Sequence, residues 1–370
     1  SSALNWCNAS DPRPDYYRYL PSYYLDHQEE YDLYVDKWTN DESQRQIDWD
    51  NLYQTNYLAK EYAGQPSSVY ILENRHSNQV NYQLNSTFNT RLNDFMTLQA
   101  GVGVNYSEAS YYKTIKDLLG GDYWLDIDQY SERDYPDNPT ILQNDLNNPN
   151  RKVGVGERFG YDYNINSVKA NAWVQNVINL AKWDINYGLN LSYTQFQRVG
   201  NMKNGRAPEI SYGKGELHQF DNAGVKVGVN YKLDGRNCFV LHGYYGTKAP
   251  LSDRAYVSPR IRDGVVAGLS SERLLSGDIS YVFSYRALKG SITGFWTEQF
   301  NSTERLSFYD DEFQTFMNYA LTNVRKSYRG VEVGLKASIT PSFSVSVAGT
   351  FSKYQYKNRP MGTRSYENGM

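Results

Sequence analysis

Apolar and polar residues alternate along many segments of this chain, and this pattern constrains the fold more than any other feature. Between Trp183 and Tyr193 every second residue is apolar, and the residues between them are polar or glycine. Successive side chains of a β-strand point to opposite faces, so this segment has one apolar and one polar face. The alternation recurs at 97–106, 225–231 and 331–339, and at least ten segments show it. The pattern predicts an all-β protein with long strands.

The predicted connections between these strands alternate between short turns and long loops. Short turns are expected near residues 93–94, 179–182, 234–235, 286–289 and 340–342. Long connections are expected at about 114–157, 200–214, 248–272 and 303–317. In an antiparallel up-and-down sheet, this order places all short turns at one end and all long loops at the other. Transmembrane β-barrels have this asymmetry, with short periplasmic turns and long extracellular loops, whereas Greek-key sandwiches do not.

The length of the strands also fits a membrane barrel. The strand at 183–193 would extend about 33 Å, which a tilt of about 45° reduces to about 23 Å of height. Aromatic residues such as Trp183, Tyr193 and Trp296 lie where the aromatic girdles of such barrels are expected. Good packing of tyrosine-rich strands is the alternative explanation of these positions. We predict an antiparallel up-and-down transmembrane β-barrel in the outer membrane.

Composition and motifs exclude several classes of function. The formal net charge is −3, so the chain lacks the basic surplus that nucleic-acid binding requires. Mean hydropathy is −0.70, and no stretch approaches the roughly 18 apolar residues of a membrane helix. Cys7, Cys238 and the four histidines show no metal-binding spacing, and no catalytic or nucleotide-binding motif occurs. We therefore expect no enzymatic activity, no metal, no cofactor and no nucleic-acid partner.

The N-terminal fifth of the chain does not show the strand pattern. Three prolines between residues 12 and 21 exclude a central strand or a helix there. Asp41 and Gln44 have capping-box spacing and precede several apolar residues, which predicts one short helix. We expect residues 1–74 to be a long extracellular loop with a short helix. Residues 75–370 are expected to form barrel strands with short periplasmic turns and long extracellular loops, as a single incomplete barrel domain.

Four strings of residues, at 11–21, 117–124, 329–335 and 359–369, carry a family resemblance. They resemble the barrel portion of TonB-dependent outer-membrane receptors of the Bacteroidota type. The resemblance implies an active transporter that binds a scarce nutrient at its extracellular loops, such as a siderophore, cofactor, glycan or peptide. It also implies partners, namely the nutrient ligand, outer-membrane lipid and the TonB-ExbB-ExbD complex. A surface lipoprotein that caps the loops is a further partner that the resemblance leaves open.

The sequence also departs from the pattern of that family. Receptors of this kind have an N-terminal plug domain, which contacts TonB, and a final strand that ends in an aromatic residue. Neither feature is present in this sequence, and about ten strands are predicted where plugged transporters have about 22. We therefore expect a partial barrel, part of a larger plugged barrel. Two alternatives remain: a passive porin-like outer-membrane channel, and a soluble β-rich glycan-binding protein.

The long loop at residues 115–157 combines acidic and aromatic residues. Trp124, Asp126, Asp128 and Tyr130 are candidate substrate-binding residues, because their rings and oxygen atoms suit contact with a ligand. Carboxylate oxygens also bind Ca²⁺, but the glycine and the distal glutamate of a calcium loop are missing. A solvated loop face is the alternative interpretation.

A second loop carries arginines beside an aromatic residue. Arg254, Tyr256, Arg260 and Arg262 are candidate substrate-binding residues as well. Planar guanidinium groups next to an aromatic ring suit an anionic or sugar-like ligand. The solubility of an exposed loop explains these residues almost as well.

Overall fold

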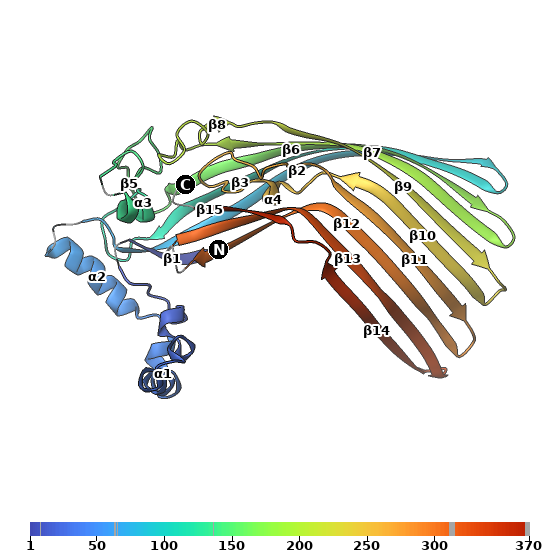
Figure 1. Ribbon diagram of the computed structural model, residues 1–370, viewed down its shortest axis with the longest axis horizontal. Coiled ribbons are helices and arrows are strands. Elements are labelled where there is room, and N and C mark those ends of the chain that lie inside the picture. Colours follow the sequence, from blue (N-terminus) through green and yellow to red (C-terminus); the bar gives the residue numbers. More distant parts are fainter. Residues whose placement is uncertain (8, 63, 65, 136, 311–314, 367–370) are drawn as a thin grey trace. The chain divides into compact units, whose positions relative to one another are not determined.

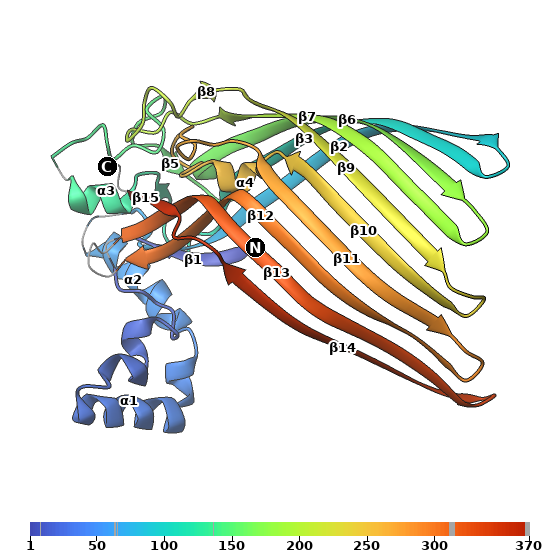
Figure 2. The ribbon, with the colours of Figure 1, turned by 45° about the vertical axis from the view of Figure 1, so that its right-hand side comes forward.

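The structure is a computed structural model that describes residues 1–7, 9–62, 64, 66–135, 137–310 and 315–366 (Figures 1 and 2). Its contacts divide the chain into two compact units. The first unit comprises Ser1–Asn78, Ser110–Asn164 and Gly200–Gly213, and the second comprises Gln79–Ala109, Ile165–Val199 and Lys214–Met370. Among these described residues, no helix is both long enough and apolar enough to cross a membrane.

In the described part of the chain, ten long strands follow one another in a single sheet, each beside the next long strand of the sequence. They are β2 (Tyr70–Asn93), β3 (Met96–Asp117), β6 (Arg158–Asn179), β7 (Trp183–Gly200), β9 (His218–Lys232), β10 (Asn237–Lys248), β11 (Glu272–Ser284), β12 (Leu288–Asp310), β13 (Thr315–Thr340) and β14 (Phe343–Tyr356). The pairs from β7 to β14 are antiparallel. This arrangement confirms the predicted antiparallel up-and-down sheet.

The described residues also form five short strands. They are β1 (Ser2–Trp6), β4 (Trp124–Leu125), β5 (Lys152–Val153), β8 (Gly213–Lys214) and β15 (Met361–Tyr366). Of these, β1 pairs with β2, β8 with β7 and β15 with β13, while β4 and β5 pair with each other.

All five predicted short turns are present, and all belong to the second unit (Figure 2). They join β2 to β3, β6 to β7, β9 to β10, β11 to β12, and β13 to β14. The turn after β9 is closed by the side chain of a residue within the turn itself. The Asp234 carboxylate accepts hydrogen bonds from the backbone N–H groups of Arg236 and Asn237, at 2.7 and 2.9 Å. Aspartate favours turns because it can close such local hydrogen bonds.

Three of the four predicted long connections are present, and the fourth is wrong. The strands β12 and β13 continue through most of residues 303–317, of which 311–314 lie outside the described residues. The pairing of β12 with β13 shifts in register between Gln299 and Glu304, and Asn301 has a positive φ of 56°. A bulge changes the phase of the inward and outward alternation. The sequence pattern therefore breaks at this point although the strand continues.

The apolar face of the sheet in the second unit is exposed. Val347, for example, is 63% exposed. The other exposed aliphatic residues on these strands include Leu189, Leu191, Val225, Val227, Leu241, Ile279, Ile292, Val331, Leu335 and Val345. A soluble protein rarely exposes so extensive an apolar surface. Membrane β-barrels present such a band outward, with polar residues on the opposite face.

The N-terminal region contains more regular structure than the sequence predicts. Its helical elements are η1 (Tyr17–Tyr19), η2 (Pro21–Tyr24), α1 (Gln28–Asn40), η3 (Glu42–Arg45) and α2 (Trp49–Glu61). The prediction of one short helix is wrong, because α1 and α2 each have 13 residues. Asp41 caps only η3, while the Asp48 carboxylate accepts a hydrogen bond from the N–H of Asn51 and caps α2. Among the described residues, no side-chain hydrogen bond caps α1, although Glu29 and Glu30 lie in its first turn.

The boundary of the first strand also differs from the prediction. Strand β2 begins at Tyr70, before the expected position 75, and its first residues pair with β1 from Trp6 to Ser2. The start of the predicted loop is therefore an edge strand. The prolines that argue against strand begin only at residue 12, so they do not affect β1.

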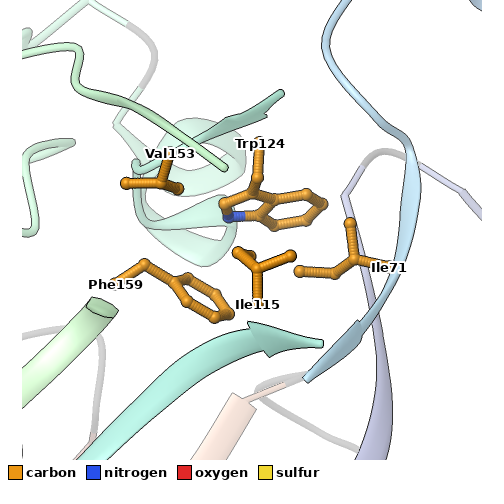
Figure 3. Packing of buried hydrophobic residues seen from close by; sticks show 5 residues of the cluster. All are labelled: Ile71, Ile115, Trp124, Val153 and Phe159. Carbon is orange, nitrogen blue, oxygen red and sulfur yellow. The ribbon is translucent and has the colours of Figure 1, made fainter. Parts of the chain in front are cut away.

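The core of the first unit lies between its strands and its long loop. Ile71, Ile115, Trp124, Val153 and Phe159 form one buried cluster (Figure 3). A second cluster joins Leu52 of α2 to Tyr70 and Leu119. These contacts attach the loop and α2 to the strands of the same unit.

Candidate functional site

Trp124 is 4% exposed and lies in a buried cluster of the first unit. Its indole packs edge-on against Phe159, with 6.2 Å between the ring centroids, and Ile71 and Ile115 lie against it (Figure 3). Strand β4 places it there, because Trp124 pairs with Val153 of β5. Burial of this large ring stabilises the loop.

Asp126 is 2% exposed, and its carboxylate joins two other parts of the loop to the start of β6. Oδ1 accepts hydrogen bonds from Nδ2 of Asn144 and from the backbone N–H of Gly160, both at 2.8 Å. Oδ2 accepts a hydrogen bond from Nη2 of Arg151 at 2.6 Å. A buried charge is tolerated when it is paired and hydrogen-bonded in this way. Asp126 therefore has a clear structural role.

Asp128 begins the short helix α3 (Gln129–Asp134). Its carboxylate accepts a hydrogen bond from the N–H of Ser131 at 2.8 Å and forms an ion pair with Arg206. Arg206 also donates a hydrogen bond to Oγ of Ser131 at 2.7 Å. The side chain of Tyr130 lies outside the described residues. Within the described residues, no three histidine, cysteine, aspartate or glutamate side chains are placed to hold a metal ion.

The arginine-containing loop, residues 249–271 between β10 and β11, is anchored by Tyr256. This residue follows the short helix α4 (Ser252–Ala255) and is fully buried. Its ring lies 5.9 Å from the rings of both Phe196 and His218. Its carbonyl oxygen accepts a hydrogen bond from Nη1 of Arg305 at 2.9 Å. Burial, and then the nearby charge of Asp263, raise the pKa of the Tyr256 hydroxyl.

A polar cluster lies beside Tyr256, and the sequence analysis did not identify it. Buried Arg198 donates a hydrogen bond from Nε to the carbonyl oxygen of Pro259 at 2.7 Å. Oδ2 of Asp263 accepts a hydrogen bond from the N–H of Glu216 at 2.6 Å. Burial raises the pKa of Asp263, although this N–H and the charge of Arg198 oppose the shift.

Within the part of the chain that the structure describes, three side-chain atoms of this cluster are buried without a hydrogen-bond partner. They are Nε2 of His218, Oη of Tyr256 and Oδ1 of Asp263. Unpaired buried polar atoms destabilise a folded chain. No local motif marks this cluster, since Arg198, His218 and Asp263 come from three separate segments.

The remaining arginines of the loop differ in their surroundings. Arg262 donates a hydrogen bond from Nη2 to Oγ of Ser365 at 2.7 Å, and this bond attaches the loop to β15. Arg254 is partly buried and Arg260 is exposed. The structure thus places all four predicted residues in one loop. Tyr256 is buried beneath this loop, and Arg260 is exposed on its surface.

The sequence matches no protein-family model and no curated protein. The structure, in contrast, is similar to solved transporters. With the copper transporter OprC the TM-score is 0.54 at 12% identity, over 80% of this chain and 40% of that one. With the FrpB iron transporter from Neisseria meningitidis (F3-3 variant) the TM-score is 0.50 at 13% identity, over 78% of this chain and 40% of that one. The chain thus spans about 40% of the length of these proteins, and the similarity shows a shared all-β fold.

Proposed function

We propose that this chain forms part of the β-barrel of a TonB-dependent outer-membrane transporter. The observation that carries the proposal is the exposed apolar face of the up-and-down sheet, because lipid is the medium that favours such a face. The names of the two similar structures, an iron transporter and a copper transporter, support transport as the activity.

The proposal includes the partners that such a transporter requires. A plug domain would fill the barrel, and the TonB-ExbB-ExbD complex would act on that plug to drive import of a bound nutrient. Outer-membrane lipid would cover the apolar face, and a surface lipoprotein is compatible with the loops. The assignment to the Bacteroidota type rests on the strings at 11–21, 117–124, 329–335 and 359–369. The protein performs binding and gating, and no chemical reaction.

We propose that the arginine-containing loop contacts the nutrient. Arg260 is exposed and Arg254 is partly exposed, and guanidinium groups suit an anionic or polyhydroxylated ligand. Tyr256 and Arg262 would act as positioning residues, because one is buried beneath the loop and the other attaches it to Ser365. In the other loop, Trp124, Asp126 and Asp128 would position the loop, and Tyr130 remains a proposed ligand contact.

Uptake in cells with and without TonB tests this function. The complete gene is expressed in an outer membrane, and uptake of the nutrient that sustains growth is measured. We expect uptake to be saturable and to be lost without TonB, and Arg254→Ala with Arg260→Ala to weaken binding about tenfold or more. Uptake that persists without TonB would indicate a passive channel. Recovery of the protein in buffer without detergent would contradict a membrane barrel altogether.

A further inference from the structure

The first unit carries an unusual surface on residues 16–62, which comprise η1, η2, α1, η3 and α2 and are called the arm below. Figure 1 shows the helix α1 (Gln28–Asn40), and none of its residues, all of which the structure describes, is buried. Leu25 and Leu33 are 68% and 50% exposed. A 13-residue helix is marginally stable by itself, and most helices are stabilised by packing of one face. One side of α1 packs on the preceding segment, because Trp38 Nε1 donates a hydrogen bond to the carbonyl oxygen of Tyr19 at 2.8 Å. The side that carries Leu33 is exposed and is open to a partner.

Aromatic rings cover the start of the arm. Tyr17 packs edge-on against Tyr16 and Tyr23, with centroid distances of 4.7 and 5.4 Å. Tyr24 contacts Tyr23 at 5.1 Å and stacks on Tyr34 of α1 at 4.5 Å. Each ring restrains its neighbour, so the aromatic surface is ordered before a partner binds. Such order reduces the entropic cost of association.

A second row of aromatics lies along α2. Trp49, Tyr53 and Tyr57 are four residues apart and therefore share one side of the helix, and they are 43% to 53% exposed. The buried side of α2 is fixed by Asn56. Its Nδ2 donates hydrogen bonds to the carbonyl oxygens of Tyr70 and Leu119, at 2.8 and 3.0 Å. The exposed row is thus held in a defined orientation.

The charge of the arm is strongly negative. Residues 26–50 contain nine acidic and two basic residues, a net charge of −7, whereas the whole chain has −3. On α1 and its start, Glu29, Glu30, Asp32 and Asp36 are all exposed. Such a field attracts a positively charged surface and repels an acidic one.

The arm itself shows how its rings bind cations. The Arg18 guanidinium lies 5.4 Å from the centroid of the Tyr17 ring, and Lys37 Nζ lies 5.1 Å from that of Tyr34. Aromatic faces attract cations, and arginine in addition stacks on them through its planar group. Aromatic rings together with carboxylates therefore recognise arginine better than lysine.

We propose that the arm is a docking surface for a partner protein that presents an arginine-rich basic surface. The exposed aromatic residues supply contact area and cation–π contacts, and the carboxylates supply attraction and orientation. This inference does not depend on the proposed transport function, because it involves other residues and a different class of ligand.

The test measures binding of short peptides to the full chain, in detergent, at about 50 mM salt. The probes are octa-arginine, octa-lysine and a neutral glycine-serine octapeptide. We expect octa-arginine to bind more tightly than octa-lysine, the neutral peptide to bind negligibly, and added salt to weaken binding of both basic peptides.

Three variants locate the interaction. Trp49→Ala with Tyr53→Ala and Tyr57→Ala is expected to weaken octa-arginine binding about tenfold and to remove its advantage over octa-lysine. Glu29→Gln, Glu30→Gln, Asp32→Asn and Asp36→Asn together are expected to weaken both basic peptides and to reduce the salt dependence. Tyr212→Ala, an exposed tyrosine outside the arm, is the matched control and should change nothing.

Two results would overturn the proposal. The first is octa-arginine binding no tighter than that of the neutral peptide or octa-lysine. The second is octa-arginine binding that the arm variants leave unchanged. All substituted side chains are exposed, so circular dichroism should show the same fold for every variant, and a loss of binding is then attributable to the surface.

Discussion

The Asp126 carboxylate and the Arg151 guanidinium form an ion pair at 2.6 Å inside the long loop of the first unit. The two residues are 25 positions apart, and the carboxylate is almost completely buried. A ligand that bound Asp126 would have to displace Arg151, Asn144 and the N–H of Gly160. The pair therefore serves the architecture of the loop.

Replacing Asp126 with alanine is expected to destabilise the loop by about 3 kcal/mol, because Arg151 would keep a partly buried charge without its partner. Limited proteolysis of the folded protein measures this effect as faster cleavage within residues 118–157. Asp137→Ala, an exposed residue of the same loop, is the control and should leave the rate unchanged. Equal cleavage rates in the two variants would contradict the structural role of Asp126.

Trp124→Ala is expected to cost about 3–5 kcal/mol, because the indole fills a buried cluster with Phe159 and Ile115. Trp124→Phe keeps most of the apolar volume and should retain most of the stability. Thermal unfolding of both variants measures the difference. A role of Trp124 in direct ligand contact requires instead that the phenylalanine variant lose binding while it keeps its stability.

Val227→Arg tests whether the apolar face of the sheet contacts lipid. Val227 is exposed on β9, and a charge on the lipid face of a barrel costs about 2–4 kcal/mol near the middle of the bilayer. We expect a smaller folded fraction in lipid vesicles, measured by the heat-dependent mobility of the protein in gels. Lys226→Arg, at the neighbouring position on the opposite face, is the control. If the two variants fold equally well, this face does not contact hydrocarbon.

Asp263 is expected to make the arginine-containing loop sensitive to pH. Burial raises the pKa of Asp263, so the folded chain binds this proton more tightly than the unfolded chain. The folded state therefore loses stability as the pH rises from the usual aspartate range, about 4, through the raised pKa. The groups that face the carboxyl are Arg198, His218, Glu216 and Tyr256.

Asp263→Asn removes this titration while it keeps an acceptor for the N–H of Glu216. Thermal midpoints of the two proteins, measured from about pH 4 to pH 7, should diverge as the pH rises, with the variant more stable at the upper end. Parallel pH profiles of the two proteins would show that Asp263 carries no such effect.

The strands and the short turns could be predicted from the sequence because each depends on residues that are close together in the chain. The alternation at 183–193 sets which side chains share a face, and the Asp234 turn closes through hydrogen bonds to residues two and three positions away. Two predictions are wrong: the long connection at 303–317 and the single short helix in residues 1–74. The bulge at Asn301 changes the phase of the alternation, and α1 begins without a side-chain cap.

The candidate site depends on contacts that no local pattern contains. Trp124 and Asp126 resemble ligand-binding residues in the sequence, but Phe159, Arg151 and Gly160 surround them in the fold. In the same way, Tyr256 stands between arginines in the sequence, but in the structure it is buried beside Arg198.

The amino-acid sequence by itself determined the strand order, the short turns and the apolar face of this protein, since each depends on residues a few positions apart. Only the tertiary structure decided which loop side chains are buried and which remain accessible. The physical reason is that the burial of a side chain depends on residues from distant segments that pack against it. Whether a charged group is paired in the interior or exposed to water depends on the same residues.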